Sequence, residues 1–328
     1  MAAGTGVDST MAVLASTLNS FVQKNIAPLV FDNVLKHNPV LYRFWRKGPV
    51  LDGGAALTWP ALTQTKRNGG WYIGAANLPH GVEDTIQPAE VLWRHVAEDI
   101  TIPRTDMLKA RTPYAKVDLV KTKFDEAILN LRARISAALY ATATEGNSLD
   151  HLFQAVDEGT DFSTYAGIAH SNTFWKCGIA GDGRYAKAST PVTTLTELEI
   201  NVYGKACDGD EQPTLGITTQ PGWDFIWGQM QALQRFVRDD EMTKAGFEAL
   251  KFNRAVLVVD RNTVANTLLF INENWIDLVS HEEENFAVDP ILPGTPSERS
   301  INTKTVWSGN LRTKIVRYHA KMVGASNF

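Results

Sequence analysis

The stretch Thr112–Thr142, TPYAKVDLVKTKFDEAILNLRARISAALYAT, decides the fold that we expect for this chain. Thr112 is a good helix-capping residue, and Pro113 at the first helical position loses no hydrogen bond. Apolar residues then recur at helical spacing, and no Gly or Pro follows before Gly146. The pattern predicts one helix of about 30 residues, roughly 45 Å long. Such a rod is typical of a beam in a large flat subunit, although a long core helix of an ordinary domain would show the same pattern.

The composition is that of a globular chain and argues against several classes. The 328 residues, of which 44% are hydrophobic and 21% charged, have room for two or three subdomains. A net charge of -4 argues against a dedicated nucleic-acid binder. Cys177 and Cys207 share no metal or redox spacing and indicate a reducing compartment. No apolar run reaches the roughly 18 residues of a membrane span, so we expect a soluble cytosolic product without a membrane contact.

The first 48 residues read as an arm with a local excess of positive charge. Met11–Ile26 has helical periodicity, which Pro28 ends. Between positions 21 and 50, five basic residues stand against Asp32 alone, a net charge of +4. These basic residues are Lys24, Lys36, Arg43, Arg46 and Lys47. They mark either a solvated helix face or a segment that faces a polyanion.

Residues 49–104 predict a long two-stranded excursion. Ala55–Thr65 alternates, with Leu57, Trp59, Ala61 and Thr63 on one face, and Glu90–Ile102 forms the return strand. The turn-rich tip between them contains Lys66, Arg67, Trp71 and Tyr72. A hairpin of this length does not hold itself up in water. Its aromatic residues therefore predict a contact with another surface, and with another subunit if this chain does not cover them.

The character changes to α/β after a segment, 146–190, that is rich in Gly, Ser and Thr. Pro191–Cys207 predicts a helix, Thr214–Thr218 a short strand, and Pro221 the start of another helix. Ala255–Val259 and Leu268–Ile271 are continuous apolar runs, which suit strands buried on both faces. We expect a mixed sheet covered by helices over about 191–300. Leu311–Val323 alternates and predicts one long half-buried strand that pairs near the rod and residues 90–102.

No catalytic signature is found in the sequence. There is no Gly-rich nucleotide loop, nucleophile elbow, HExxH or EF-hand pattern, and no two of the seven histidines have ligand spacing. Two acidic clusters, 208–211 and 281–285, have the carboxylates of a divalent-ion site but also the composition of solvated loops. Asp260 and Asn272, at the ends of buried strands, stand where an α/β enzyme places catalytic groups and are also ordinary strand-end residues. We therefore predict a chain that is not an enzyme and that holds no cofactor or metal.

The order of these parts resembles the major capsid protein of tailed bacteriophages, the HK97-like fold. Several phrases carry the resemblance, which covers most of residues 20–325. They are TyrAlaGlyIle (165–168) followed by Trp175, ThrProValThr (190–193), LeuGlyIleThrThr (215–219), the run 246–260 and LeuLeuPheIleAsnGluAsnTrp (268–275). The resemblance implies an α+β fold with an N-terminal arm (1–48), an extended β-hairpin loop (49–104), a peripheral domain with the spine helix (105–190), an axial α/β domain (191–299) and a C-terminal strand (300–328) that returns to the peripheral domain. No long charged helical region precedes the arm, so the scaffold would be a separate or already removed protein.

The resemblance also implies contacts. Hexamers and pentamers of the chain would form an icosahedral head around double-stranded DNA, inside the host bacterial cytoplasm and later in the virion, with a portal, a scaffolding protein and a possible decoration protein as partners. The hairpin would lie on a neighbour's spine helix, and acidic tip loops would surround the symmetry axes. The expected inter-subunit residues are Trp59, Lys66, Arg67, Trp71, Tyr72, Asp208, Asp210, Glu211, Glu282, Glu283 and Glu284, and the basic residues of the arm would face DNA. Lys66 also stands where some relatives form a Lys–Asn crosslink, without a partner motif.

Two alternatives stay open at this point. One is an encapsulin-like compartment shell of the same fold, which would enclose an enzyme instead of DNA; the basic arm favours the viral interpretation. The other is a cytosolic α/β enzyme whose site is assembled from scattered residues such as Asp260, Asn272 and the histidines.

Overall fold

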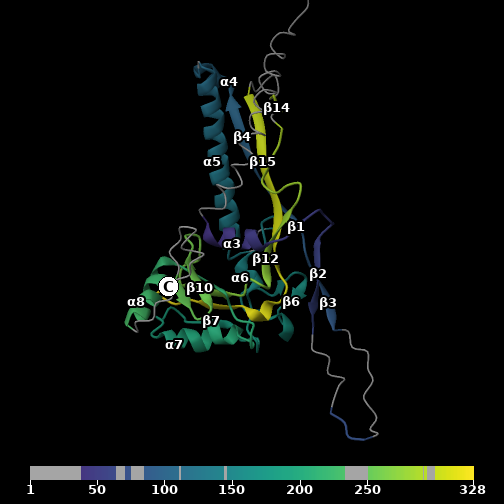
Figure 1. Ribbon diagram of the computed structural model, residues 1–328, viewed down its shortest axis with the longest axis vertical. Coiled ribbons are helices and arrows are strands. Elements are labelled where there is room, and N and C mark those ends of the chain that lie inside the picture. Colours follow the sequence, from purple (N-terminus) through teal and green to yellow (C-terminus); the bar gives the residue numbers. More distant parts are fainter. Residues whose placement is uncertain are drawn as a thin grey trace, which may run out of the picture.

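The computed structural model describes residues 38–63, 71–74, 85–110, 112–143, 146–232, 250–290, 292–293 and 300–328. The predicted helix Met11–Ile26 and residues Lys24, Lys36, Lys66 and Arg67 lie outside these ranges. Figure 1 shows three parts: a tall wing of one long helix and two long strands, a body of short strands and helices below it, and a strand pair that runs beside the body. Among the described helices, none is both long and apolar enough to cross a bilayer.

The long helix of the wing is α5 (Pro113–Leu139), which confirms the prediction from Thr112–Thr142. The Thr112 side chain accepts a hydrogen bond from the backbone N–H of Ala115 at 3.2 Å, so the predicted cap forms. One face of the helix is fully covered and includes Phe124, Leu131 and Ile135. Burial of this apolar stripe stabilises the helix more than its intrinsic propensity does.

A six-stranded sheet forms the rest of the wing and continues down to the body. Its central strand is β15 (Ser300–Thr313), which pairs antiparallel with β4 (Arg94–Pro103) from Ser300↔Pro103 to Gly309↔Arg94. The other neighbours of β15 are β12 (Ile276–His281), β13 (Ala287–Val288) and β14 (Leu292–Pro293), and β1 (Val50–Leu51) pairs with β12. Gly309 pairs on both sides, and a Cβ there would lie 2.3 Å from the carbonyl oxygen of Val279. Glycine is therefore required at this position, where β15 pairs with β12 on one side and with β4 on the other.

The strand pair beside the body is formed by β2 (Leu57–Leu62) and β3 (Ile86–Val91), which are antiparallel from Leu57↔Val91 to Leu62↔Ile86. The prediction of one return strand over Glu90–Ile102 was wrong. The chain breaks at Leu92–Trp93, and the following strand, β4, pairs with β15 and leaves the hairpin. The reason lies in a distant partner, β15, near the other end of the sequence, because Ile100 and Ile102 bury their side chains in the wing. Helix α4 (Arg104–Lys109) then leads from β4 to α5.

The body contains a second six-stranded sheet in the order β7-β16-β11-β8-β10-β9. Its strands are β7 (Arg184–Ala186), β8 (Leu215–Thr218), β9 (Leu250–Phe252), β10 (Ala255–Val259), β11 (Thr267–Ile271) and β16 (Ala320–Val323). The two apolar runs are buried strands, β10 and β11, as predicted. Helix α8 (Gln220–Ala232) confirms the predicted helix around Pro221. The predicted helix Pro191–Cys207 begins only at Leu195 and is irregular, because α7 (Leu195–Leu198) continues as a π-turn to Tyr203 and a 3-10 turn to Ala206.

The predicted single strand Leu311–Val323 was also wrong. Strand β15 ends at Thr313, the chain makes a 3-10 turn over Val316–Tyr318, and β16 joins the body sheet between β7 and β11. Side chains alternate with a period of two in one long strand and also in two successive strands. The alternation in the sequence therefore does not reveal that the chain crosses from the wing sheet to the body sheet. Strands β12 to β14 also belong to the wing sheet and not to the mixed sheet predicted for 191–300.

Helix α3 (Pro39–Lys47) joins the two sheets. It packs against β12 and the body with Val40, Leu41 and Phe44, which are fully buried, and lies below α5 in Figure 1. The Asn38 side chain caps α3 and donates a hydrogen bond to Ser136 Oγ of α5. Short elements fill the space under the wing: α6 (Leu152–Ala155), β5 (Thr164–Tyr165) and β6 (Ile168–Ala169).

Candidate contact surfaces

The two faces of the hairpin differ in what covers them. Leu57, Trp59 and Ala61 of β2 are buried, and the residues between them are exposed, as the alternation predicted. Trp59 is only 7% exposed and belongs to the core of this chain. It was predicted as a contact to another subunit; the structure places it against its own subunit, because the base of the hairpin rests on the chain that carries it.

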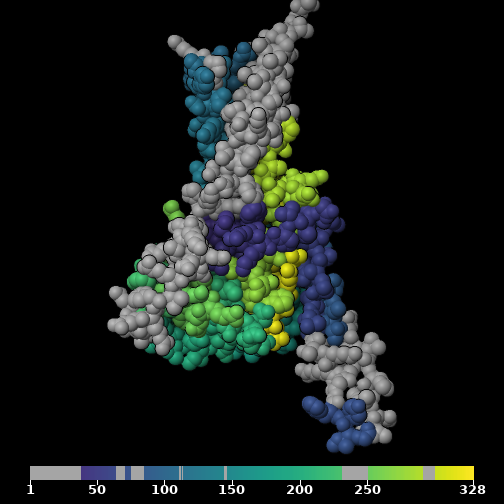
Figure 2. Space-filling model, in the orientation of Figure 1, coloured from purple at the N-terminus to yellow at the C-terminus, as the bar shows by residue number. Residues whose placement is uncertain are grey.

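The far part of the hairpin has no such cover among the described residues. Trp71, Tyr72 and Ile73 are 106%, 62% and 96% exposed, and the cross-strand pair Leu62 and Ile86 is 62% and 55% exposed. Figure 2 shows residues 71–74, in blue, well below the body. Exposed apolar side chains of this kind mark interaction sites in folded proteins. We name Trp71, Tyr72 and Ile73 the hairpin tip patch.

The two acidic clusters belong to different parts of the fold. Asp208 and Asp210 are exposed in the body, while the Glu211 carboxylate accepts hydrogen bonds from Asn272 Nδ2 at 2.7 Å and Trp275 Nε1 at 2.8 Å. Glu211 was predicted to contact another subunit, and in this structure its carboxylate is held by contacts within its own chain.

The second acidic cluster follows β12 in the wing sheet. Glu282 and Glu283 are exposed, and Glu284 Oε2 accepts a hydrogen bond from Ser308 Oγ and lies 3.2 Å from His95 Nδ1. The hydrogen bond from Ser308 is the main reason that the pKa of Glu284 lies below its ordinary value. The cluster 208–211 belongs to the body, and 281–285 follows β12 of the wing sheet; that both are tip loops around the symmetry axes stays a prediction.

The described basic residues of the arm are not all directed to solvent. Arg43 forms two parallel hydrogen bonds with the carboxylate of Glu273, at 2.7 and 2.8 Å, and Lys47 Nζ lies 3.2 Å from the same group. The Glu273 side chain is 1% exposed and also accepts a hydrogen bond from Thr214 Oγ1. Burial raises the pKa of Glu273, but the contacts with Arg43, Lys47 and Thr214 outweigh it and hold the pKa below its ordinary value. Only Arg46, of the three described, is exposed without an ion pair of this kind.

Asp260 and Asn272, two of the residues proposed for an enzyme, have different hydrogen-bond partners. Asp260 is buried and accepts a hydrogen bond from Tyr140 Oη at 3.0 Å, whereas the backbone N–H of Asn272 donates to His319 Nδ1 at 3.1 Å. Burial raises the pKa of Asp260 and lowers that of His319 to about 3. In the part of the chain that the structure describes, no three His, Cys, Asp or Glu side chains are arranged to hold a metal ion.

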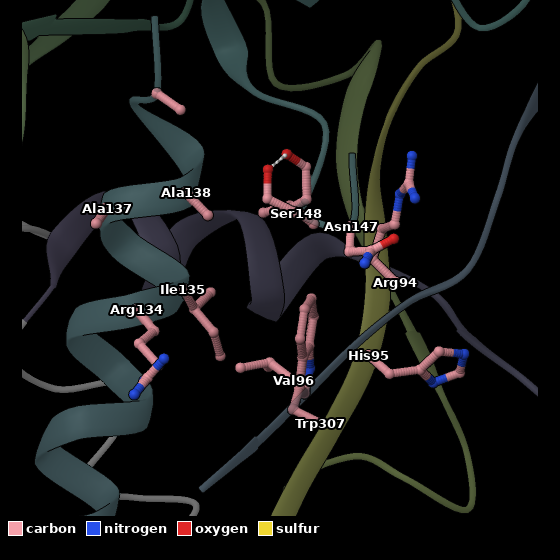
Figure 3. Close-up of a pocket in the computed structure, with 12 residues that line it drawn as sticks. Arg94, His95, Val96, Arg134, Ile135, Ala137, Ala138, Asn147, Ser148 and Trp307 are labelled. Carbon is pink, nitrogen blue, oxygen red and sulfur yellow. Dashed lines mark hydrogen bonds between the residues drawn. The ribbon is translucent and has the colours of Figure 1, made fainter. Parts of the chain in front are cut away.

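A pocket of about 370 Å³ lies in the wing, between α5, β4, β15 and residues 147–149. Figure 3 shows Ile135, Val96 and Trp307 close to one another on its apolar side, with Arg94 and Asn147 at the opposite end. Small side chains at the end of α5, Ala137 and Ala138, and Ala141 just after it line this space. The sequence analysis missed the pocket, although the cluster of alanines at the end of the long helix was a signal for it. Arg134 Nε is ion-paired with Glu98 at 2.9 Å, and Arg94 donates to the Gly146 carbonyl.

Comparison with known proteins gives a consistent result at the level of the fold. No family model matches the chain, and no curated protein sequence matches it either. Among solved structures, the capsid of cyanophage A-1(L) aligns over 88% of this chain and 93% of its own, with a TM-score of 0.64 and 13% identity. The capsid of the native GTA particle aligns over 85% and 89%, with a TM-score of 0.58 and 8% identity. The holo-SrpI encapsulin complex from Synechococcus elongatus aligns over 84% of both chains, with a TM-score of 0.53 and 9% identity. The wing with its long helix, the hairpin and the body sheet therefore make up the HK97-like capsid fold.

Proposed function

We propose that this chain is the subunit of a phage head: a structural protein that assembles into hexamers and pentamers and closes an icosahedral shell around double-stranded DNA. The observation that carries the proposal is the hairpin tip patch, because Trp71 and Ile73 are almost completely exposed and residues 71–74 lie well below the body in Figure 2. An exposed patch of this kind fits a surface elsewhere on a second copy. Such head-to-tail contacts generate rings and closed shells when their rotation closes.

The fold supports the same proposal. The chain shares its architecture with the capsids of cyanophage A-1(L) and the GTA particle over most of its length. In this proposal the hairpin of one subunit lies on the wing of its neighbour, and Trp71 and Tyr72 are the aromatic anchors of the contact. The virion is the site of action after assembly in the host cytoplasm, and scaffolding, portal and decoration proteins are the expected partners. Lys66 and Arg67 would flank the contact.

The shell is tested by size. We expect closed particles tens of nanometres across, or rings of subunits, in sedimentation and negative-stain images of the chain expressed alone and with its genomic neighbours. Deletion of residues 68–77 removes Trp71, Tyr72 and Ile73 and should leave a folded subunit that no longer closes shells. A matched control replaces 68–77 with Gly and Ser at the same length. It should fail as the deletion does, because the side chains and not the length supply the contact; normal particles from both variants would overturn the role of the tip.

The encapsulin-like alternative has one observation in its favour. Two of the basic residues predicted to face DNA, Arg43 and Lys47, contact Glu273 within the subunit, so the described part of the arm offers less charge to a polyanion than its sequence does. Purified particles distinguish the two functions: nuclease-protected double-stranded DNA supports the phage head, and a co-purifying protein cargo without DNA supports the compartment. A clean monomer or dimer in every preparation would contradict both shell functions and favour the hypothesis of a cytosolic α/β enzyme.

A further inference from the structure

Lys321 of β16 is a lysine without solvent contact. Its side chain is 0% exposed, and its Nζ lies 2.8 Å from Asp157 Oδ1 and 2.8 Å from Asp161 Oδ2. The Nζ also donates to the carbonyl oxygen of Phe153 at 3.3 Å, and the Phe153 ring lies 6.0 Å away. The amine is thus held in one place by β16 on one side and by the segment after α6 on the other.

The charges around Lys321 divide into two pairs. Arg184 forms two hydrogen bonds with Asp161, both at 3.0 Å, and so neutralises that carboxylate from the outside. Asp157, whose side chain is also 0% exposed, is then the counter-ion of Lys321. The nearby His151 adds no charge at neutral pH, because burial and the charge of Lys321 lower its pKa to about 4. A fully enclosed Lys–Asp pair is expensive, since both ions have lost their hydration.

The two oxygens of Asp157 are in different environments. Oδ2 accepts hydrogen bonds from the backbone N–H groups of Asp161, at 3.0 Å, and Phe162, at 2.6 Å. Oδ1 has no other hydrogen-bond partner among the described residues and lies 2.8 Å from the Lys321 ammonium. Two backbone N–H groups aimed at one carboxyl oxygen are the arrangement that stabilises a developing oxyanion.

We propose that Lys321 and Asp157 join in an intramolecular isopeptide bond. Asp161 Oδ2 takes a proton from the Lys321 ammonium and passes it to Asp157 Oδ1, and the neutral amine attacks Asp157 Cγ. Negative charge collects on Oδ2, where the N–H groups of Asp161 and Phe162 hold it. A second proton passes from Nζ through Asp161 to Oδ1, the Cγ–Oδ1 bond breaks, and Oδ1 leaves as water. One ammonium and one carboxylate become one amide and one water, with no other reactant.

Burial and positioning favour this condensation in the folded chain. The reaction removes two buried ions and leaves a neutral amide, whereas Asp161 and Arg184 remain a balanced pair. Reacting groups held in contact gain an effective concentration of about 10⁵–10⁸ M over free partners. The Asp161 side chain is 33% exposed and connects the cluster to solvent. The water released by the condensation can leave along this side.

The intact mass of the denatured subunit tests the bond directly and does not depend on whether shells form. We expect a mass lower than that of the sequence by one water, and a branched proteolytic peptide that joins Lys321 to Asp157. Lys321→Arg should have the full mass of its sequence, because a guanidinium does not condense. Asp161→Asn should lower the bonded fraction, because it removes the group that relays the protons.

A matched control is present in the same chain. Lys205 and Asp182 also form a close ion pair, but their side chains are 39% and 43% exposed. They should stay unlinked in the same peptide map, because water solvates both ions. Wild-type subunit that keeps its full mass after a week of incubation in the folded state would overturn the proposal, whether or not the variants fold.

Discussion

The hairpin and the body sheet are both made of short strands, yet they obtain their stability from opposite sources. In the body, β8, β10 and β11 have side chains buried on both faces by residues of the same chain. In the hairpin, β2 and β3 bury one face at the base, and the tip patch beyond it is exposed. The described strands of the body are thus covered within one subunit, whereas the described tip of the hairpin is exposed. Substitutions in the body should therefore unfold the subunit, whereas substitutions in the hairpin tip should leave it folded but unable to assemble.

The largest effect should come from the body. Phe270 of β11 is 0% exposed and packs against Tyr203 and Phe252, with ring centroids 5.3 and 5.6 Å away. Phe270→Ala should lower the free energy of unfolding by about 3–5 kcal/mol, because it removes a buried aromatic and leaves a cavity. Urea denaturation of the unassembled subunit measures this. A loss below about 1 kcal/mol would contradict the view that the body is the self-sufficient part.

The next effect should come from the junction between the arm and the body. Glu273→Gln keeps the shape of the side chain but removes the charge that Arg43 and Lys47 contact. We expect a loss of about 2 kcal/mol, the range of a hydrogen bond to a charged group. The matched control is Arg46→Gln on the same helix, an exposed residue whose loss should cost less than about 0.5 kcal/mol. Equal losses in both variants would show that Glu273 does not hold α3 in place.

A smaller effect should appear on acidification, and it should follow the body. His319 and His151 have pKa values lowered to about 3 and about 4 by burial, from an ordinary value of 6.5. Below pH 6.5 these histidines therefore bind protons in the unfolded chain but not in the folded chain. The free energy of unfolding, which is highest above pH 6.5, falls as the pH drops toward 4. His319→Asn keeps an acceptor for the N–H of Asn272 and should reduce this pH dependence. A free energy of unfolding that depends on pH as strongly in the variant as in wild type would contradict the role of His319.

The smallest effect on stability should come from the hairpin tip. Trp71→Ala should change the free energy of unfolding by less than about 0.5 kcal/mol, because the indole is fully exposed in the isolated subunit. Assembly, followed by sedimentation, should suffer far more than stability. A marked loss of thermal stability in the monomer would mean that Trp71 packs against its own subunit, and the contrast between tip and body would fail.

The same contrast separates what could be predicted from the sequence. Helix α5 and strands β10 and β11 were predictable because their signals are local: the Thr112 cap with Pro113, and two uninterrupted apolar runs. The alternation of Leu57, Trp59 and Ala61 likewise gave the correct buried face of β2.

The failures lie where the answer depends on a distant partner. Nothing in the residues around Glu90–Ile102 reveals that β4 leaves the hairpin to pair with β15, and nothing around Leu311–Val323 reveals a change of sheet. Arg43 and Lys47 read as free cations until Glu273, more than 200 residues later, is placed beside them. Trp59 and Trp71 belong to the same predicted excursion, and only the packing of β2 distinguishes the buried indole from the exposed one.

The long pairing of β4 with β15 has a mechanical consequence. Strand β3 continues through Leu92–Trp93 into β4, so a pull on the hairpin is transmitted along the axis of β4. Along that axis the ten pairs from Ser300↔Pro103 to Gly309↔Arg94 carry the load in shear, all at once, and do not open one after another. Tension from a neighbouring subunit would thus reach α5 through the β4–β15 pairing, which resists shear along the strands better than stepwise opening of its hydrogen bonds. A subunit built in this way can be stretched at its edge while its centre stays folded.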